Sequence, residues 1–205
     1  MAETHAGNLK LLGGRLCLDF VNTVDWHGSD HAVEFLHTYE DLLAWSRHLT
    51  IVTEDEVSNM LQCARRTPDQ ATHVLERAIA LREALFRLFP VVAEGHAPPA
   101  DDLAILNEAL RRAPSRPQIA WSPPHFVWMY QGDDDALDRV LWPVAWSAAD
   151  LLASAERERV KVCPGEDCGW LFLDASRNGT RRWCAMEGCG NRAKARRHYQ
   201  RARKG

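Results

Sequence analysis

The sequence predicts a mainly α-helical protein, with a helical N-terminal domain that includes a small β-hairpin and a compact C-terminal module made of a hairpin and a basic helix. Three observations lead to this fold class. Apolar residues recur at helical spacing through most of residues 1–158. Helix-capping signals precede several of these stripes. Four of the six cysteines lie within residues 159–205, which we interpret as a separate domain.

Composition places the chain among ordinary globular proteins. Hydrophobic residues make up 46% and charged residues 26% of its 205 residues, which is typical of a folded domain rather than a disordered chain. No apolar run approaches the ~20 residues that cross a bilayer, so we expect no membrane contact. Residues 1–10 contain no apolar signal-peptide core, and we therefore expect a cytoplasmic protein.

Charge is distributed unevenly along the chain. Residues 157–205 hold thirteen Lys or Arg against five Asp or Glu, a balance of +8. Residues 1–156 carry −11, and the overall charge is −3. An acidic body with a basic C-terminal segment is typical of a protein that meets a polyanion at one end only.

The N-terminal helices are predicted from their caps and apolar stripes. Leu16–Val24 fits a helix or a strand, and we favour the helix. Each later helix starts at a capping pair or a proline: Thr38 with Asp41, Thr53 with Glu56, Thr67 with Pro68, and Pro98-Pro99. The helix that starts at Pro68 is long and amphipathic and should end near Gly95, and Pro114 should end the next one.

The periodicity changes after this point. Short apolar and aromatic runs at 118–121 and 126–130 predict a small β-hairpin. A final long helix should present apolar residues from Leu137 to Ala155 to the core, with a kink at Pro143. We expect the neighbouring aromatic residues to be buried core, with the walls of a small-molecule pocket as the alternative: Trp121, Phe126, Trp128, Trp142 and Trp146.

Asp19 and Asn22 are polar residues beside the apolar run near the start of the chain. They could line a ligand pocket, or they could cap helices, and the sequence leaves both interpretations open. The chain carries no Gly-rich phosphate loop, nucleophile elbow or paired-carboxylate motif. We therefore expect no catalysis.

Cys163, Cys168, Cys184 and Cys189 form two close pairs separated by a medium loop. Zinc prefers four ligands in a tetrahedron and binds thiolate sulfur well, so this pattern predicts one Zn²⁺ ion. Free or redox-active thiols are one alternative, and a catalytic zinc is another. Four thiolates fill the coordination shell, which favours a structural site.

The loop between the two cysteine pairs contains Asn178-Gly179, a strong turn dipeptide. We expect a hairpin around this turn, with Trp170 and Phe172 on one side and Arg182-Trp183 on the other. A helix that starts at the second pair should follow, as in a treble-clef arrangement. Because metal binding and local folding are coupled, zinc loss should unfold this module and leave the helical body folded.

The chain ends in an arginine-rich segment with high helix propensity. Ala195, Tyr199 and Ala202 share a face that could rest on the module, and basic residues occupy both flanks. A solvated charged helix is the alternative to a nucleic-acid contact, and Asn191 could cap the helix. The predicted contacts to nucleic acid are Arg177, Arg181, Arg182, Asn191, Arg192, Lys194, Arg196, Arg197, Arg201 and Arg203.

The C-terminal block resembles the CGNR zinc-finger family, which is named for the stretch Cys189-Gly190-Asn191-Arg192. The rest of the resemblance lies in Cys163, Cys168-Gly169-Trp170-Leu171-Phe172-Leu173-Asp174, Arg182-Trp183-Cys184, Met186 and Lys194-Ala195-Arg196-Arg197. The N-terminal part resembles the ABATE domain at 16–23 and 148–152. This resemblance implies a bacterial protein with a mainly helical N-terminal domain, of a kind described as stress-induced transcription regulators.

These observations lead to one main functional hypothesis. The zinc module and its basic helix bind DNA, while residues 1–158 sense a small-molecule effector or mediate homodimerisation. RNA or an acidic protein could take the place of DNA, in which case the module would serve as an RNA-binding element or an interaction adaptor. An enzyme that uses an N-terminal pocket is the hypothesis we favour least.

Overall fold

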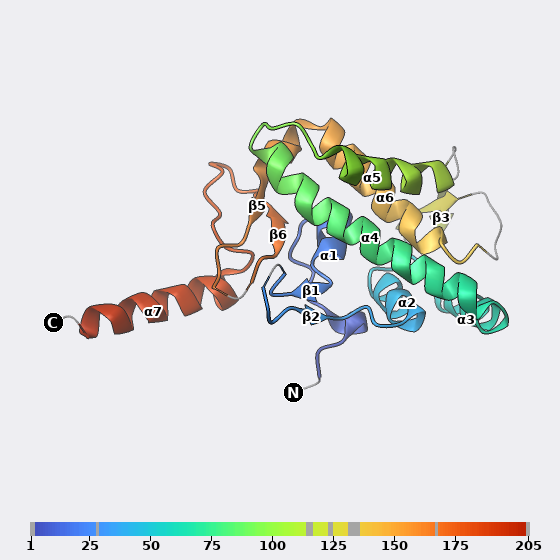
Figure 1. The fold of residues 1–205 in the computed structure, drawn as a ribbon, viewed down its shortest axis with the longest axis horizontal. Coiled ribbons are helices and arrows are strands. Elements are labelled where there is room, and N and C mark those ends of the chain that lie inside the picture. Colours follow the sequence, from blue (N-terminus) through green and yellow to red (C-terminus); the bar gives the residue numbers. More distant parts are fainter. Residues whose placement is uncertain are drawn as a thin grey trace.

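A computed structural model of the chain describes residues 3–27, 29–113, 117–122, 125–130, 136–166 and 168–203. Helices dominate it (Figure 1), which confirms the mainly α fold class. The α-helices are α1 (Leu16–Val21), α2 (Tyr39–His48), α3 (Glu54–Arg66), α4 (Pro68–Ala93), α5 (Ala100–Arg112), α6 (Trp142–Ala153) and α7 (Asn191–Ala202). In the described part of the chain, no helix has the length and apolar composition required to cross a bilayer.

Among the described residues, the strands form three separate antiparallel pairs. The strand pairs are β1 (Val24–Asp25) with β2 (Val33–Glu34), β3 (Pro117–Ser122) with β4 (His125–Tyr130), and β5 (Val160–Val162) with β6 (Leu171–Leu173). Short helical turns complete the fold: η1 (Ala6–Asn8), η2 (Arg139–Leu141), η3 (Ala155–Arg159) and the π-helical turn η4 (Met186–Gly190).

The long helix α4 runs through the middle of the molecule (Figure 1). It packs against α5 and α6 on one side and against α1 and α2 on the other. The largest fully buried side chains in this core include Phe20, Trp45 and Phe89. Leu171 and Leu173 of β6 belong to the same core although they lie far away in sequence. The C-terminal segment therefore packs on the helical body through apolar side chains.

The predicted capping boxes of α2 and α3 are confirmed. The Thr38 side chain accepts a hydrogen bond from the N–H of Asp41, and the Asp41 carboxylate accepts from the N–H of Thr38. Thr53 and Glu56 make the same reciprocal pair. Both pairs satisfy amide groups that the first helical turn would otherwise leave without a partner.

Other helix boundaries also follow from local signals. Pro68 occupies the first turn of α4, where no amide hydrogen is needed, and α4 ends two residues before Gly95, whose φ of +80° is left-handed. Thr67 makes no side-chain cap hydrogen bond, and its hydroxyl donates instead to the carbonyl of Cys63. Helix α5 follows Pro99 as expected, whereas Pro114 lies outside the described residues.

The prediction of a kink at Pro143 is wrong. Helix α6 begins at Trp142, so Pro143 lies in its first turn rather than in its interior. The preceding residues form the separate turn η2. Proline at this position starts a helix because the first-turn N–H groups have no intrahelical acceptor.

The β3–β4 hairpin is where we predicted it, but most of the aromatic residues near it are not core. Trp121 is 57% exposed, Phe126 is 71% exposed and Trp146 is 39% exposed, whereas Trp142 is buried. The rings of Trp121 and Phe126 contact each other across the strands at 4.8 Å between centroids. The side chain of Trp128 lies outside the described residues.

A buried ion pair joins β2 to α4. The guanidinium of Arg82, which is only 2% exposed, donates to both carboxylate oxygens of Glu34 at 2.7 and 2.6 Å. Glu34 also accepts hydrogen bonds from the backbone N–H groups of Phe35 and Leu36. Arg82 also donates from its Nε to Glu83 at 3.0 Å, so removal of Glu34 would leave the buried guanidinium with one carboxylate partner instead of two.

We therefore expect Glu34→Ala to lower the free energy of unfolding by about 2 kcal/mol, measured by urea denaturation, because two charge-assisted hydrogen bonds to a buried guanidinium are lost. Glu54→Ala is the matched control, because the Arg47–Glu54 pair is exposed on both sides. Its cost should stay below about 1 kcal/mol. Equal costs for the two variants would contradict a structural role for the Arg82–Glu34 pair.

Candidate zinc centre and basic helix

The first cysteine pair lies in the turn that joins β5 to β6. The N–H of Cys163 donates to the carbonyl of Trp170 at 2.8 Å, and the N–H of Cys168 donates to the carbonyl of Gly165 at 3.1 Å. Gly165 has a steric role here, since a Cβ at this position would lie 3.1 Å from both the Cys168 Cβ and the Cys189 Sγ. The turn therefore brings both thiols to one side without a side chain between them.

The second pair approaches from the loop after β6, with Cys184 in the loop and Cys189 in η4. All four sulfur atoms are buried and lie within 4.8 Å of one another. Sγ–Sγ distances of 3.6 Å (Cys168–Cys184) and 3.7 Å (Cys184–Cys189) match the edge of about 3.8 Å expected for a tetrahedron with Zn–S bonds of ~2.3 Å. The four cysteines therefore fit one zinc ion with a closed shell of thiolates.

Two further groups donate hydrogen bonds to the sulfur atoms. The backbone N–H of Cys184 donates to the Cys163 Sγ at 3.4 Å, and a guanidinium nitrogen of Arg192 donates to the Cys189 Sγ at 3.3 Å. Hydrogen bonds of this kind stabilise thiolate over thiol, which is the form that binds metal. The second pair is therefore held by the first turn of the basic helix as well as by the loop.

Family models match almost the whole chain. Residues 14–155 match ABATE, described as "Putative stress-induced transcription regulator", and residues 159–202 match the CGNR zinc finger. The chain belongs to the ABATE family. Its C-terminal part is a CGNR zinc finger. No curated protein matches the chain.

The hairpin within the zinc finger differs from our prediction. Asn178-Gly179 does lie in a turn, and Gly179 has a left-handed φ of +64°. However, β6 pairs with β5, so the hairpin encloses the first cysteine pair rather than this turn. Arg182 and Trp183 lie outside any strand. The segment 160–162, at the start of the predicted zinc module, supplies the missing partner strand.

The loop between β6 and Cys184 is held by Asp174, a fully buried residue that sequence reasoning did not single out as functional. Its carboxylate accepts hydrogen bonds from Lys161 Nζ at 2.6 Å, from the N–H of Arg181 at 3.0 Å and from Ser176. Burial alone would raise the pKa of Asp174, but the bonds from Lys161 and Ser176 outweigh it and hold this pKa well below its usual range. In the sequence, the only indication of a role for Asp174 was its position at the end of the stretch 168–174, which resembles the CGNR family.

Asn22 joins the ABATE domain to the zinc finger. Its side-chain amide donates to the carbonyl of Leu171 and accepts from the N–H of Leu171, both at 2.9 Å. The indole N–H of Trp170 also donates to the carbonyl of Val24 at 3.0 Å. Asp19 accepts a hydrogen bond from the N–H of Gly13 at 2.7 Å. Both predicted pocket residues therefore connect backbone segments of the fold.

Three of the predicted nucleic-acid contacts have structural partners within the finger. Arg181 donates to the carbonyls of Leu173 (3.1 Å), Trp183 (3.1 Å), Leu12 (3.2 Å) and Cys184, and it lies 4.5 Å from the centroid of the Phe172 ring. Arg192 contacts the Cys189 sulfur, and Arg196 forms an ion pair with Glu166. The first two hold backbone and metal ligands in place, and the third joins α7 to the first cysteine turn.

Arg192 and Arg196 are exposed despite these contacts. The remaining predicted contacts are exposed as well: Arg177, Arg182, Asn191, Lys194, Arg197, Arg201 and Arg203. Helix α7 has no buried residue and extends from the finger away from the rest of the molecule (Figure 1). Tyr199 is 71% exposed, so the expectation that its face rests on the module is wrong. The amide of Asn191 donates to the carbonyl of Glu187 at 3.4 Å and does not act as an N-cap acceptor.

Cys184→Ser should remove stoichiometric zinc and also destabilise the helical body. The reason is that β6, which follows the first cysteine pair, contributes Leu171 and Leu173 to the main core. We expect the free energy of unfolding of the helices to fall by about 3 kcal/mol or more, because metal binding contributes directly to folding. Urea titrations followed by helical circular dichroism measure this loss, and a colorimetric chelator measures zinc.

This outcome differs from the local unfolding that the sequence alone suggested. Cys63→Ser is the matched control, since it makes the same chemical change outside the sulfur cluster and should leave the zinc content unchanged. If the helical transition of Cys184→Ser coincides with that of the parent while zinc is lost, the finger unfolds independently and the shared core is energetically unimportant.

Asp19 should make stability depend on pH. Burial raises the pKa of its carboxyl from an ordinary value of 3.8 to about 6, against the opposing hydrogen bonds from the backbone of Gly13 and Leu12. The folded protein therefore keeps a proton that the unfolded chain releases. The resulting stabilisation is complete below the unfolded pKa and is lost as pH rises through about 6.

Asp19→Asn removes this titration. Relative to the parent, the variant should gain on the order of 2 kcal/mol in unfolding free energy between roughly pH 4 and 7. Urea denaturation at a series of pH values measures the difference, with the exposed Asp101→Asn as control. A constant difference across this pH range would show that Asp19 is ionised throughout.

Proposed function

We propose that this protein is a transcription regulator that binds duplex DNA through its CGNR zinc finger, with α7 as the main contact element, and that it catalyses no reaction. The description of the ABATE family as a stress-induced transcription regulator supports the regulatory role. The observation that carries the DNA-binding proposal is the position of α7, an exposed basic helix attached to the protein at its N-terminal end.

The charge of α7 favours a polyanionic partner. No Asp or Glu follows Glu187 in the chain, so the helix has no acidic side chain of its own to offset its arginines. Among the described residues, the one ion pair of this helix is Arg196 with Glu166. Repulsion among the remaining cations is relieved when phosphate groups bind and condensed counterions are released from DNA.

The shape of the helix also suits DNA. An α-helix with its side chains is ~10–12 Å across, and the major groove of B-DNA is ~12 Å wide. Because α7 extends away from the body, both of its flanks are accessible. Lys194, Arg197 and Arg201 occupy one flank, since they are three and four residues apart. We assign phosphate contacts to this flank and to Arg177 and Arg182 in the loop.

Arg197→Glu with Arg201→Glu should weaken binding to duplex DNA by at least about a hundredfold at moderate salt. The slope of log affinity against log salt concentration should also become shallower, by about one for each phosphate group that the variant no longer binds. Fluorescence anisotropy with a labelled duplex measures both quantities. Neither arginine has a partner among the described residues, so zinc content and helical circular dichroism should be unchanged.

The matched control is Arg65→Glu with Arg66→Glu, which changes the net charge equally at the exposed end of α3, at the opposite end of the molecule (Figure 1). This control should retain most of the affinity. Equal reductions in affinity for the two double variants would mean that only net charge matters and that α7 is not the contact. A single-stranded RNA of the same length, run in parallel, distinguishes RNA from DNA, and preference for RNA would overturn the assignment to duplex DNA.

A further inference from the structure

We propose that the ABATE domain binds a small organic acid with an apolar body in a cavity between α4, α5 and α6. The cavity has a volume of about 350 Å³. Binding sites for small molecules have volumes of ~300–1,000 Å³, mostly apolar walls and a few convergent polar groups. This proposal concerns ligand binding alone and does not depend on the binding of DNA by the zinc finger.

Apolar side chains from all three helices form the walls. Leu81 comes from α4, Ile105 and Ala109 come from α5, and Trp142 comes from α6, with Leu141 just before it. Ala80 of α4 and Ala104 of α5 also line the cavity, and their side chains are single methyl groups that leave room between these helices. An apolar group of a ligand would therefore replace water against a largely aliphatic surface.

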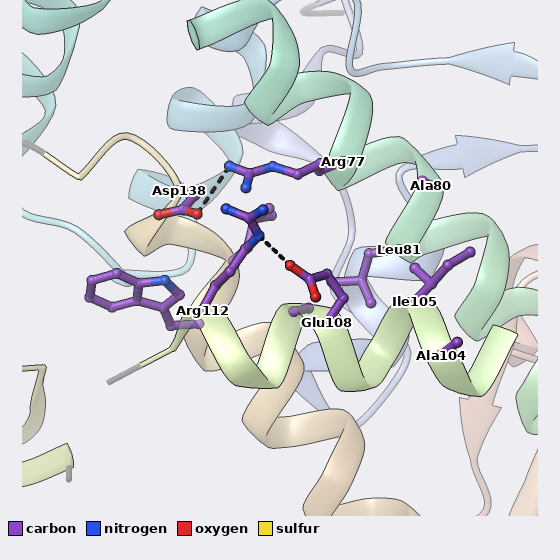
Figure 2. A pocket seen from close by; sticks show the side chains of 11 residues that line it. Arg77, Ala80, Leu81, Ala104, Ile105, Glu108, Arg112 and Asp138 are labelled. Atoms are coloured by element: carbon purple, nitrogen blue, oxygen red, sulfur yellow. Dashed lines mark hydrogen bonds and ion pairs between the residues drawn. The ribbon is translucent and has the colours of Figure 1, made fainter. Parts of the chain in front are cut away.

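Charged groups gather at one end of this cavity. Figure 2 shows the guanidinium groups of Arg77 and Arg112 at the same end, next to Asp138. Arg77 donates to Asp138 at 3.0 Å, and the Nε of Arg112 donates to Glu108 at 2.9 Å. These carboxylates hold both guanidinium groups at this end of the cavity.

The hydrogen-bonding balance at this end favours an acceptor. Each guanidinium carries several N–H donors that its carboxylate partner does not engage. The Nε of Arg77 is buried and has no acceptor among the described residues. Glu108 already accepts from Arg111 as well as Arg112. A ligand with a carboxylate would supply acceptors where donors are in excess, and planar carboxylates match the fork geometry of arginine.

Isothermal titration calorimetry on the full-length protein tests the proposal with three probes of equal shape. These are 4-phenylbutyrate, its neutral counterpart 4-phenyl-1-butanol and its cationic counterpart 4-phenylbutylamine. We expect the acid to bind about tenfold more tightly than the alcohol or the amine, because a charge-assisted hydrogen bond to a guanidinium group is worth about that factor. Tighter binding of the amine or the alcohol would overturn the assignment.

Two variants locate the site. Arg112→Gln should raise the Kd of the acid to that of the alcohol and leave the Kd of the alcohol unchanged, whereas the neighbouring Arg111→Gln should change neither. Ala104→Trp should fill the cavity and abolish binding of the acid, whereas Asn107→Trp, on the same helix but outside the cavity lining, should not.

Circular dichroism of each variant establishes that it is folded, so that a failure to bind reports on the cavity. Absence of heat for all three probes at millimolar concentration would also overturn the proposal, as would unchanged binding of the acid to Ala104→Trp. None of these outcomes bears on DNA binding, which is measured separately.

Discussion

Four cysteine sulfurs hold together two chain segments, the β5–β6 turn and η4. Cys163 and Cys168 are presented by a turn whose flanking strands are rooted in the main core, and Cys189 lies at the last turn before the basic helix. A tetrahedral metal centre restricts how these two segments are oriented. The direction in which α7 leaves the molecule is therefore set mainly at this cluster.

The zinc finger is also part of the helical body. Asn22 binds both backbone groups of Leu171, Trp170 binds the carbonyl of Val24, and Arg181 reaches the carbonyl of Leu12. These contacts attach the finger near α1 on the acidic N-terminal part of the chain. Had α7 folded back onto that part, the acidic groups would have neutralised it. Extension away from the body instead keeps its positive field available to a partner.

Local chemistry predicted much of this fold. Capping boxes at Thr38 and Thr53 specify where helices start from residues that are three apart. The spacing of the four cysteines in two close pairs identifies the metal site. The kink predicted at Pro143 was a local error, because the helix starts at Trp142, whereas other errors involve partners distant in sequence. The strand that pairs with β6 is a three-residue segment without a pattern of its own. The exposure of Trp121 and Phe126 depends on which element covers the hairpin, which periodicity does not encode.

The sequence also does not reveal which arginines of the zinc finger have a structural role and which are available to a partner. Arg181, Arg192 and Arg197 look alike in a sequence, where each adds one positive charge to a basic segment. In the structure, Arg181 donates to carbonyl groups and Arg192 donates to a cysteine sulfur, whereas Arg197 makes no hydrogen bond or ion pair with the described residues. Substitution of the first two would disturb the metal centre and weaken any binding indirectly. Only substitutions of arginines without such contacts, such as Arg197 and Arg201, can separate recognition of a polyanion from folding of the finger.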